Sequence, residues 1–168
     1  MEASLRRLLL DPEFWRPRLE RLEKVPRHMV IFPVPQLVRP GIDACELRLR
    51  AHDEARLRAL LVRPAFCQEG GRIQLRPCER ADVDDVDWEC IDKGGTDVVF
   101  AYPDDRRLED RVLDVVRLAR AACCMESVDC SHLGFGNGLE SIPDELVIAE
   151  WLRNEGWIAG RPGPNGPQ

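Results

Sequence analysis

A glycine-rich turn near the carboxyl end of the sequence has the surroundings of a catalytic turn. Residues 128–141 read VDCSHLGFGNGLES, where a short apolar run precedes the glycines and a helix-like segment follows them. In many enzymes a strand, a sharp turn and a helix in this order present a nucleophile. The turn consists of Gly134, Gly136, Asn137 and Gly138. Its crest is a glycine in either register, so the turn itself carries no nucleophile.

The nucleophilic and basic side chains near the turn all lie before or after its crest. Cys130 and Ser131 precede it, Ser141 follows it, and His132 is the nearby base. We expect no catalytic residue in the usual position. Cys130, Ser131 and His132 stay as candidates for a nucleophile and its base outside the usual position.

Two other kinds of site use residues of the same region. Cys123 and Cys124, together with Cys130 and His132, offer ligands that suit zinc. Adjacent helical residues point about 100° apart, however, so buried thiols are the alternative interpretation. The glycines could hold an anion at the start of the following helix or simply turn the chain. We expect no metal and no cofactor.

Composition narrows the class of protein further. The 168 residues carry a net charge of −6 and a pI near 5.2, which gives no general attraction to nucleic acid or anionic lipid. No apolar run approaches the roughly 20 residues of a membrane span. Seven cysteines form no regular disulfide pattern, which favours reduced thiols and a cytoplasmic location.

The second half of the chain alternates strands and helices. Residues 96–103 form an apolar run of buried-strand type, and a helix is expected over 106–126. A strand over 130–135 leads into the turn, and a helix follows from 141 to 157. This order predicts a mostly parallel, three-layer α/β sheet.

The first half predicts an antiparallel contribution to that sheet. A helix over 12–25 begins at the cap Asp11 and is expected to kink or restart at Pro17. Four prolines make residues 26–40 an extended connector. Residues 45–51 and 56–62 alternate as a β-hairpin. A third strand, residues 72–76, and a short acidic helix, residues 82–95, follow.

These elements predict three parts of the chain. Residues 1–40 form a helical arm and connector, residues 41–159 a partial α/β domain, and residues 160–168 a disordered tail. Aromatic and apolar side chains of the arm and the last helix are candidates for an interface. They are Phe14, Trp15, Val147, Ile148, Trp151 and Trp157.

Longer stretches resemble a known family. PEFWRPRLERLEKVP and GIDACELRLRAHDEARLRALLVRP resemble the front of the acetyl xylan esterase and cephalosporin deacetylase branch of the α/β hydrolases. GTDVVFAYPDDRRLEDRVLDVVRLARAACCMESVDCSHLGFGNG resembles the centre of that fold. The resemblance runs from about Pro12 to Leu152. It implies the N-terminal half of an α/β hydrolase, with its glycine-turn strand at an open sheet edge.

The catalytic motifs of that family are missing here. The elbow has no serine, RIQLRPCERADVDD has no glycine or histidine for the oxyanion loop, and no histidine follows His132. We therefore expect a truncated, degenerate relative that works as a non-catalytic binding or assembly module. A second copy, a protein partner or the proline-rich connector would cover the open edge. The alternative is a residual acetyl-esterase-like hydrolase of small acetylated substrates.

Overall fold

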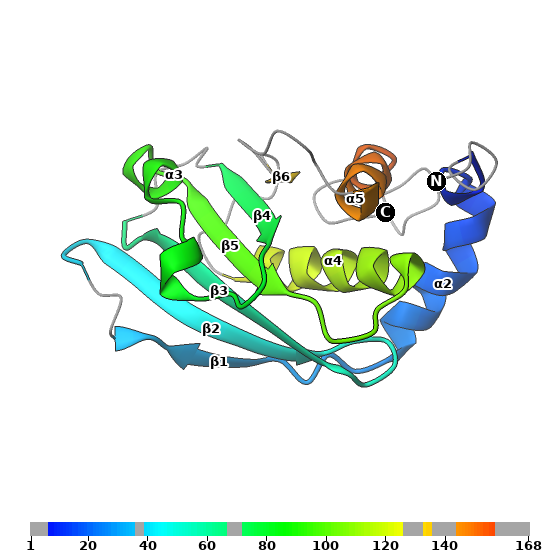
Figure 1. Ribbon diagram of the computed structural model, residues 1–168, viewed down its shortest axis with the longest axis horizontal. Helices are drawn as coiled ribbons and strands as arrows, with labels where there is room; N and C mark the ends of the chain where they lie inside the picture. Colours follow the sequence, from blue (N-terminus) through cyan, green and yellow to red (C-terminus); the bar gives the residue numbers. More distant parts are fainter. Residues whose placement is uncertain (1–6, 36–38, 67–71, 126–132, 136–143, 157–168) are drawn as a thin grey trace.

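A six-stranded mixed sheet is the centre of the molecule. The computed structural model describes residues 7–35, 39–66, 72–125, 133–135 and 144–156. The strands lie in the order β1-β2-β3-β5-β4-β6, with helices on both faces (Figure 1). This is the predicted three-layer α/β arrangement. The strands are β1 Val30–Pro33, β2 Ile42–Arg50, β3 Arg56–Pro64, β4 Ile73–Pro77, β5 Thr96–Ala101 and β6 Leu133–Phe135.

The predicted hairpin is confirmed as β2 and β3. They pair antiparallel along their whole length, from Ile42 opposite Pro64 to Arg50 opposite Arg56. Side chains alternate between the two faces of a strand. Leu47 and Leu49 therefore enter the core, while Arg48 and Arg50 point to the other face.

The proline-rich connector contains a strand that the sequence analysis missed. Val30–Pro33 forms β1 and pairs antiparallel with β2. Proline is tolerated there because β1 is an edge strand, where a missing N–H breaks no inner ladder. The connector therefore extends the β2 end of the sheet, and the described part of it does not cover the opposite edge at β6.

The parallel half follows the predicted strand and helix order. β4 pairs parallel with β5 on one side and with β6 on the other. The chain passes from β5 through the long helix and across β4 to reach β6. β6 is thus the end strand of the sheet in the described part of the chain, as the resemblance implied.

The helices agree with the predicted positions and differ at their ends. They are α2 Pro12–Lys24, α3 Trp88–Asp92, α4 Leu108–Cys123 and α5 Asp144–Asn154. Asp11 caps α2 by accepting a hydrogen bond from the Glu13 N–H, and the helix does not restart at Pro17. Within the described ranges, none of these helices combines the length and apolarity that crossing a bilayer requires.

The expected single acidic helix over 82–95 is two short elements. The 3-10 turn η2 Val83–Asp85 is followed by α3, which ends at Asp92 two residues before Gly94, whose φ is 83°. The break occurs where the Asp87 N–H donates to the Asp97 carboxylate over 2.7 Å. Asp97 is fully buried in β5 and also accepts hydrogen bonds from Arg76, at 2.6 and 2.9 Å. The ion pair joins β4 to β5, and the hydrogen bond from Asp87, the N-cap of α3, attaches α3 to the sheet.

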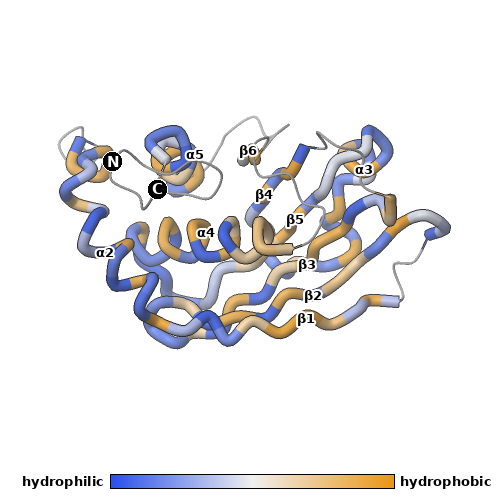
Figure 2. The backbone as a smooth tube through the Cα atoms, turned by 180° about the vertical axis from the view of Figure 1, so that it is seen from behind, coloured by the Kyte–Doolittle hydropathy of each residue, from blue (hydrophilic) through white to orange (hydrophobic). Residues whose placement is uncertain are grey.

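Two apolar layers enclose the sheet. Figure 2 shows α4, with α2 and α5 near it, on one face of the strands. The larger core lies there and includes Trp15, Leu47, Phe100 and Val116. A smaller core on the other face packs Leu60, Val62, Val86, Ile91 and Val99 together.

Candidate functional site

The carboxyl ends of parallel strands are where α/β sheets usually bind ligands or carry out reactions. In this chain that edge contains the ends of β4, β5 and β6. The β2–β3 turn joins it, because β3 runs antiparallel to β5 with Arg58 opposite Ala101. We call the region formed by the β2–β3 turn, residues 78–82, residues 102–107 and the start of α4 the carboxyl edge.

An ion-pair chain fixes one side of the carboxyl edge. Arg106 contacts Asp114 of α4 through two hydrogen bonds of 2.9 and 3.0 Å, and it also pairs with Asp53 of the hairpin turn. The Arg106 and Asp114 side chains are almost fully buried. Burial raises the pKa of Asp114 to about 7, although Arg106 acts in the opposite direction. Arg106 lowers the pKa of the more exposed Asp53.

A histidine and a carboxylate meet beside this chain. His52 Nε2 lies 2.9 Å from Asp110 Oδ1. Such a pair orients the base in a catalytic triad, but a triad also needs a nucleophile beside the histidine. All four serines of the sequence lie outside the described residues. In the described part the pair ties the hairpin turn to α4.

The cysteine that follows β4 has the environment of a structural thiol. Cys78 lies where the family resemblance implies an oxyanion loop, and its Sγ accepts the Ala81 N–H over 2.9 Å. Burial raises the pKa of the Cys78 thiol. Because the thiolate is the nucleophilic form, this environment does not favour covalent catalysis.

The side of the carboxyl edge nearest α5 is aromatic and charged. The Arg111 guanidinium carbon lies 5.3 Å from the centre of the Tyr102 ring, and Arg111 Nη1 lies 3.4 Å from Glu145 Oε1. Burial is the main reason that the pKa of Tyr102 is raised. These contacts attach α5 to the loop after β5.

The predicted catalytic candidates and most of the turn cannot be placed. Cys130, Ser131 and His132 lie outside the described residues, as do Gly136, Asn137 and Gly138. Gly134 is described and lies in β6 opposite Gln74 of β4. A Cβ at Gly134 would come within 3.3 Å of the Arg72 guanidinium, so the backbone approaches Arg72 closely.

The metal candidates are only partly described. Cys124 is an exposed free thiol, and Cys123 is disulfide-bonded, which the sequence analysis did not anticipate. A disulfide sulfur is not the thiolate that binds zinc. Within the described ranges, no three His, Cys, Asp or Glu side chains are grouped to hold an ion.

The interface candidates divide by burial. Trp15 and Ile148 are enclosed by the core of this chain, which leaves their side chains almost no surface for a partner. Phe14 and Trp151 pack against the core from partly exposed positions, and Val147 is also partly exposed. Trp157 lies outside the described residues. Interface contacts by Phe14, Val147 and Trp151 stay a prediction.

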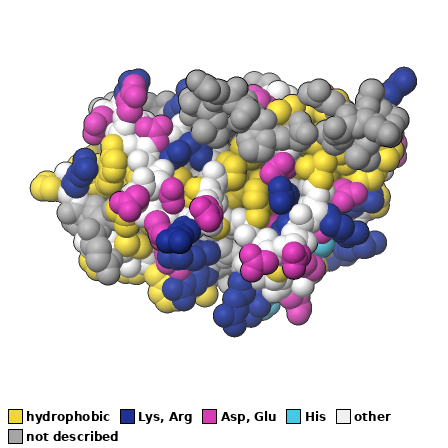
Figure 3. Space-filling view, viewed as in Figure 1, with side chains coloured by type: hydrophobic (Ala, Val, Ile, Leu, Met, Phe, Trp, Pro, Cys, Tyr) yellow, Lys and Arg dark blue, Asp and Glu magenta, His cyan; other side chains and the backbone are white. Residues whose placement is uncertain are grey.

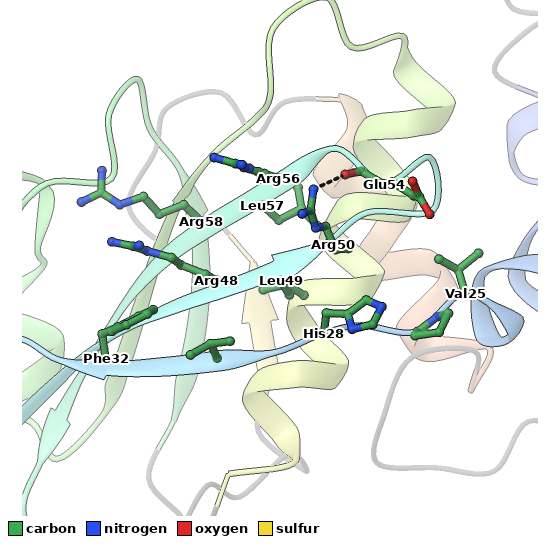
Figure 4. A pocket seen from close by; sticks show the side chains of 12 residues that line it. Val25, His28, Phe32, Arg48, Leu49, Arg50, Glu54, Arg56, Leu57 and Arg58 are labelled. Carbon is green, nitrogen blue, oxygen red and sulfur yellow. Dashed lines mark hydrogen bonds between the residues drawn. The ribbon is translucent and has the colours of Figure 1, made fainter.

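A cavity that the sequence analysis missed lies against the antiparallel half of the sheet. It has a volume of about 740 Å³ and is bordered by the end of α2, β1 and the β2–β3 hairpin (Figure 4). Four of its lining residues are arginines of the hairpin: Arg48, Arg50, Arg56 and Arg58. The alternation in ELRLR and RLR was a signal for them, because every second residue of a strand shares a face.

The wall of this cavity is held by one buried cation. Arg117 of α4 donates hydrogen bonds of 2.7 to 3.0 Å to four backbone carbonyl oxygens. Three of these carbonyls belong to lining residues, namely Val25, Pro26 and Arg50, and the fourth belongs to Leu22. The end of α2, the connector and β2 are therefore fixed relative to one another.

Comparisons with known proteins agree with the fold. No protein-family model and no curated protein matches the sequence. The structure is similar to an acetyl xylan esterase from a Paenibacillus species, with a TM-score of 0.61 and 14% identity over 81% of this chain and 56% of that one. Acetyl xylan esterase 1 from a Thermoanaerobacterium species gives a TM-score of 0.59, with 14% identity over 80% of this chain and 55% of that one.

The coverage fits the predicted resemblance to the N-terminal half of an α/β hydrolase. This chain spans about half the length of the esterases it matches. Identities this low establish a shared fold and leave the activity open. The chain therefore has the α/β-hydrolase-like fold of the acetyl xylan esterases over about half the length of such an enzyme.

Proposed function

We propose that the protein is a non-catalytic binding or assembly module built on part of an α/β-hydrolase-like fold. The observation that carries this proposal comes from the sequence after β6, where Gly136 or Gly138 occupies the position of the elbow nucleophile. The family resemblance implies a nucleophile elbow at this position, but neither register supplies a serine. The module would act through a protein partner or a second copy of the chain.

The chemistry of the carboxyl edge supports this proposal. Arg106, Asp114 and Asp53 are engaged with one another, as are His52 and Asp110. The described thiol at this edge, Cys78, has a raised pKa. The contacts of Arg106 and His52 connect the hairpin turn with α4 and the loop after β5. Such contacts suit a structural role better than acid–base or nucleophilic work.

The sheet edge at β6 supports the assembly part of the proposal. β6 pairs with β4 on one side and ends the strand order of the described sheet. A strand at an edge presents backbone N–H and C=O groups that readily pair with another chain. Covering this edge with a second copy or a partner would satisfy those groups.

Two measurements test the proposal. Hydrolysis of a chromogenic acetate ester by the purified protein should equal that of a Ser131→Ala/His132→Ala/Cys130→Ala triple variant and of His52→Ala. Native mass spectrometry should show an oligomer or a complex with one defined partner. Turnover that disappears in any of these variants would instead support the residual esterase. A compact monomer without a partner would contradict the assembly role.

A further inference from the structure

The cavity beside the hairpin concentrates positive charge in an acidic protein. Arg48 lies directly opposite Arg58 across β2 and β3, and Arg50 lies directly opposite Arg56. Residues that are opposite each other in an antiparallel pair share one face of the sheet, so all four guanidinium groups extend to the same side. Figure 3 shows Lys and Arg side chains gathered low on this face, where Figure 1 places β1 to β3.

The described acids balance only part of this charge. Glu46 pairs with Arg58 over 3.1 Å and also with Arg48. Arg50 donates to the backbone carbonyl of Glu54 over 3.0 Å rather than to a carboxylate. Arg56 is exposed, and no described carboxylate forms an ion pair with it or with Arg50. Like charges opposite each other destabilise a strand pair, so an anion between Arg50 and Arg56 would relieve a repulsion.

An apolar wall adjoins the arginines. Val30 of β1 is 50% exposed and lies opposite Arg48, while Phe32 is 40% exposed. Their side chains share the face of the arginines, since Val30 and Arg48 are paired and Phe32 is two residues along the strand. The Arg48 guanidinium carbon lies 4.4 Å from the centre of the Phe32 ring. Val25 and Pro26 extend the apolar border of the cavity.

The cavity is preformed and has the size of a small-molecule site. Its volume of about 740 Å³ is within the range of roughly 300–1,000 Å³ for ligand pockets. Three of the four hydrogen bonds from Arg117 fix the backbone of Val25, Pro26 and Arg50 before any ligand arrives. A fixed wall lowers the ordering cost of binding.

We propose that this cavity binds a small amphipathic anion, with its carboxylate or phosphate group between Arg50 and Arg56 and its apolar body along Val30 and Phe32. Arginine forks bind both of these anionic groups through paired hydrogen bonds. The cavity lies on the antiparallel half of the sheet, and this site goes beyond the proposed module function. It stands whether or not the carboxyl edge hydrolyses esters.

The test is binding of two anionic probes and one neutral probe of equal chain length. Octanoate, octyl phosphate and octanol are titrated into the full chain by calorimetry, with near 0.1 M salt held constant. At least one anion should bind saturably and more tightly than octanol. An Arg50→Gln/Arg56→Gln variant should bind that anion at least tenfold more weakly, as expected when charge-assisted hydrogen bonds are lost. Phe32→Ala should weaken the binding of that anion by a similar factor.

A matched control removes the same charge elsewhere. Arg7 and Arg21 are exposed arginines outside the cavity lining, and an Arg7→Gln/Arg21→Gln variant should bind like the parent. Circular dichroism checks folding, and the cavity variant should be at least as stable as the parent because a repulsion is removed. Octanol binding as tight as that of the tighter-binding anion, equal loss of anion binding in both double variants, or no saturable binding of either anion would overturn the site.

Discussion

Arg117 offers the sharpest test of how the structure is held together. The Arg117 side chain is buried, and it donates to carbonyl oxygens from the end of α2, the connector and β2. Burial lowers its pKa, which measures how unfavourable the buried charge is. The guanidinium fork stays in place because several elements supply acceptors at once. Substituting Arg117 should therefore loosen the N-terminal helix from the sheet.

The size of the effect follows from these contacts. Four hydrogen bonds at a net contribution of about 1 kcal/mol each give about 4 kcal/mol. Arg117→Met removes the cost of burying a charge and keeps much of the packing, which offsets part of this loss. We expect the free energy of unfolding to fall by about 2–3 kcal/mol. Arg117→Lys should lower the free energy of unfolding at least as much, because a single ammonium group cannot reach all four carbonyl oxygens.

Urea unfolding followed by circular dichroism and tryptophan fluorescence measures this change. Arg21→Met is the control, since Arg21 is exposed on α2 and its substitution should change stability by less than about 0.5 kcal/mol. If Arg117→Met lowers the free energy of unfolding by less than about 1 kcal/mol, the four hydrogen bonds do not hold these elements together as argued. Full retention of stability in Arg117→Lys would show that charge alone matters.

Three further predictions use other buried groups. Asp97→Asn and Arg76→Met should each lower the free energy of unfolding by about 3–5 kcal/mol, because each leaves a buried partner uncompensated. In urea unfolding, an Asp97→Leu/Arg76→Met variant should lose less stability than the sum of the losses in its single variants, and additive losses would contradict the coupling. Asp114 has a raised pKa in the fold, so its contribution to stability is fully present below its unfolded pKa of about 4 and is lost as the pH rises through about 7. The stability of the parent relative to Asp114→Asn, measured at pH 4 to 8, should fall over that range, and a rise would mean that the Arg106 ion pair dominates. His52→Ala should lower the melting temperature by a few degrees without changing acetate-ester turnover, because its contact with Asp110 is structural; lost turnover would place His52 in a catalytic site.

Local pattern was enough to predict most strands and helices. The alternation in residues 45–51 and 56–62, the apolar run over 96–103 and the helical pattern over 106–126 all predicted elements near their observed positions. The hairpin segments and the long helix each have a periodicity that favours one secondary structure, and the run over 96–103 has the length of a buried strand. The strand β1 was missed because its pairing with β2 is a long-range contact, and the neighbouring prolines favoured an irregular segment.

The sites depended on contacts that no local pattern contains. Asp97 lies within the apolar run TDVVFA, and only the fold shows that Arg76 from the neighbouring strand neutralises it. Arg117 is buried in α4, and its carbonyl partners come from residues far earlier in the chain. The missing nucleophile, in contrast, can be read directly from the sequence, because an elbow requires a serine at one fixed position and this chain has a glycine there. Missing chemistry was therefore easier to predict than the cavity.

The two ends of the sheet differ in how they could accept another strand. β1 has four residues, ends in Pro33 and is followed by Pro35, so a strand added there gains few hydrogen bonds. β6 carries no proline within Leu133–Phe135. If two copies joined through β6, each would turn its proline-blocked end outward. Growth would then stop at a closed two-fold pair instead of continuing into a fibre.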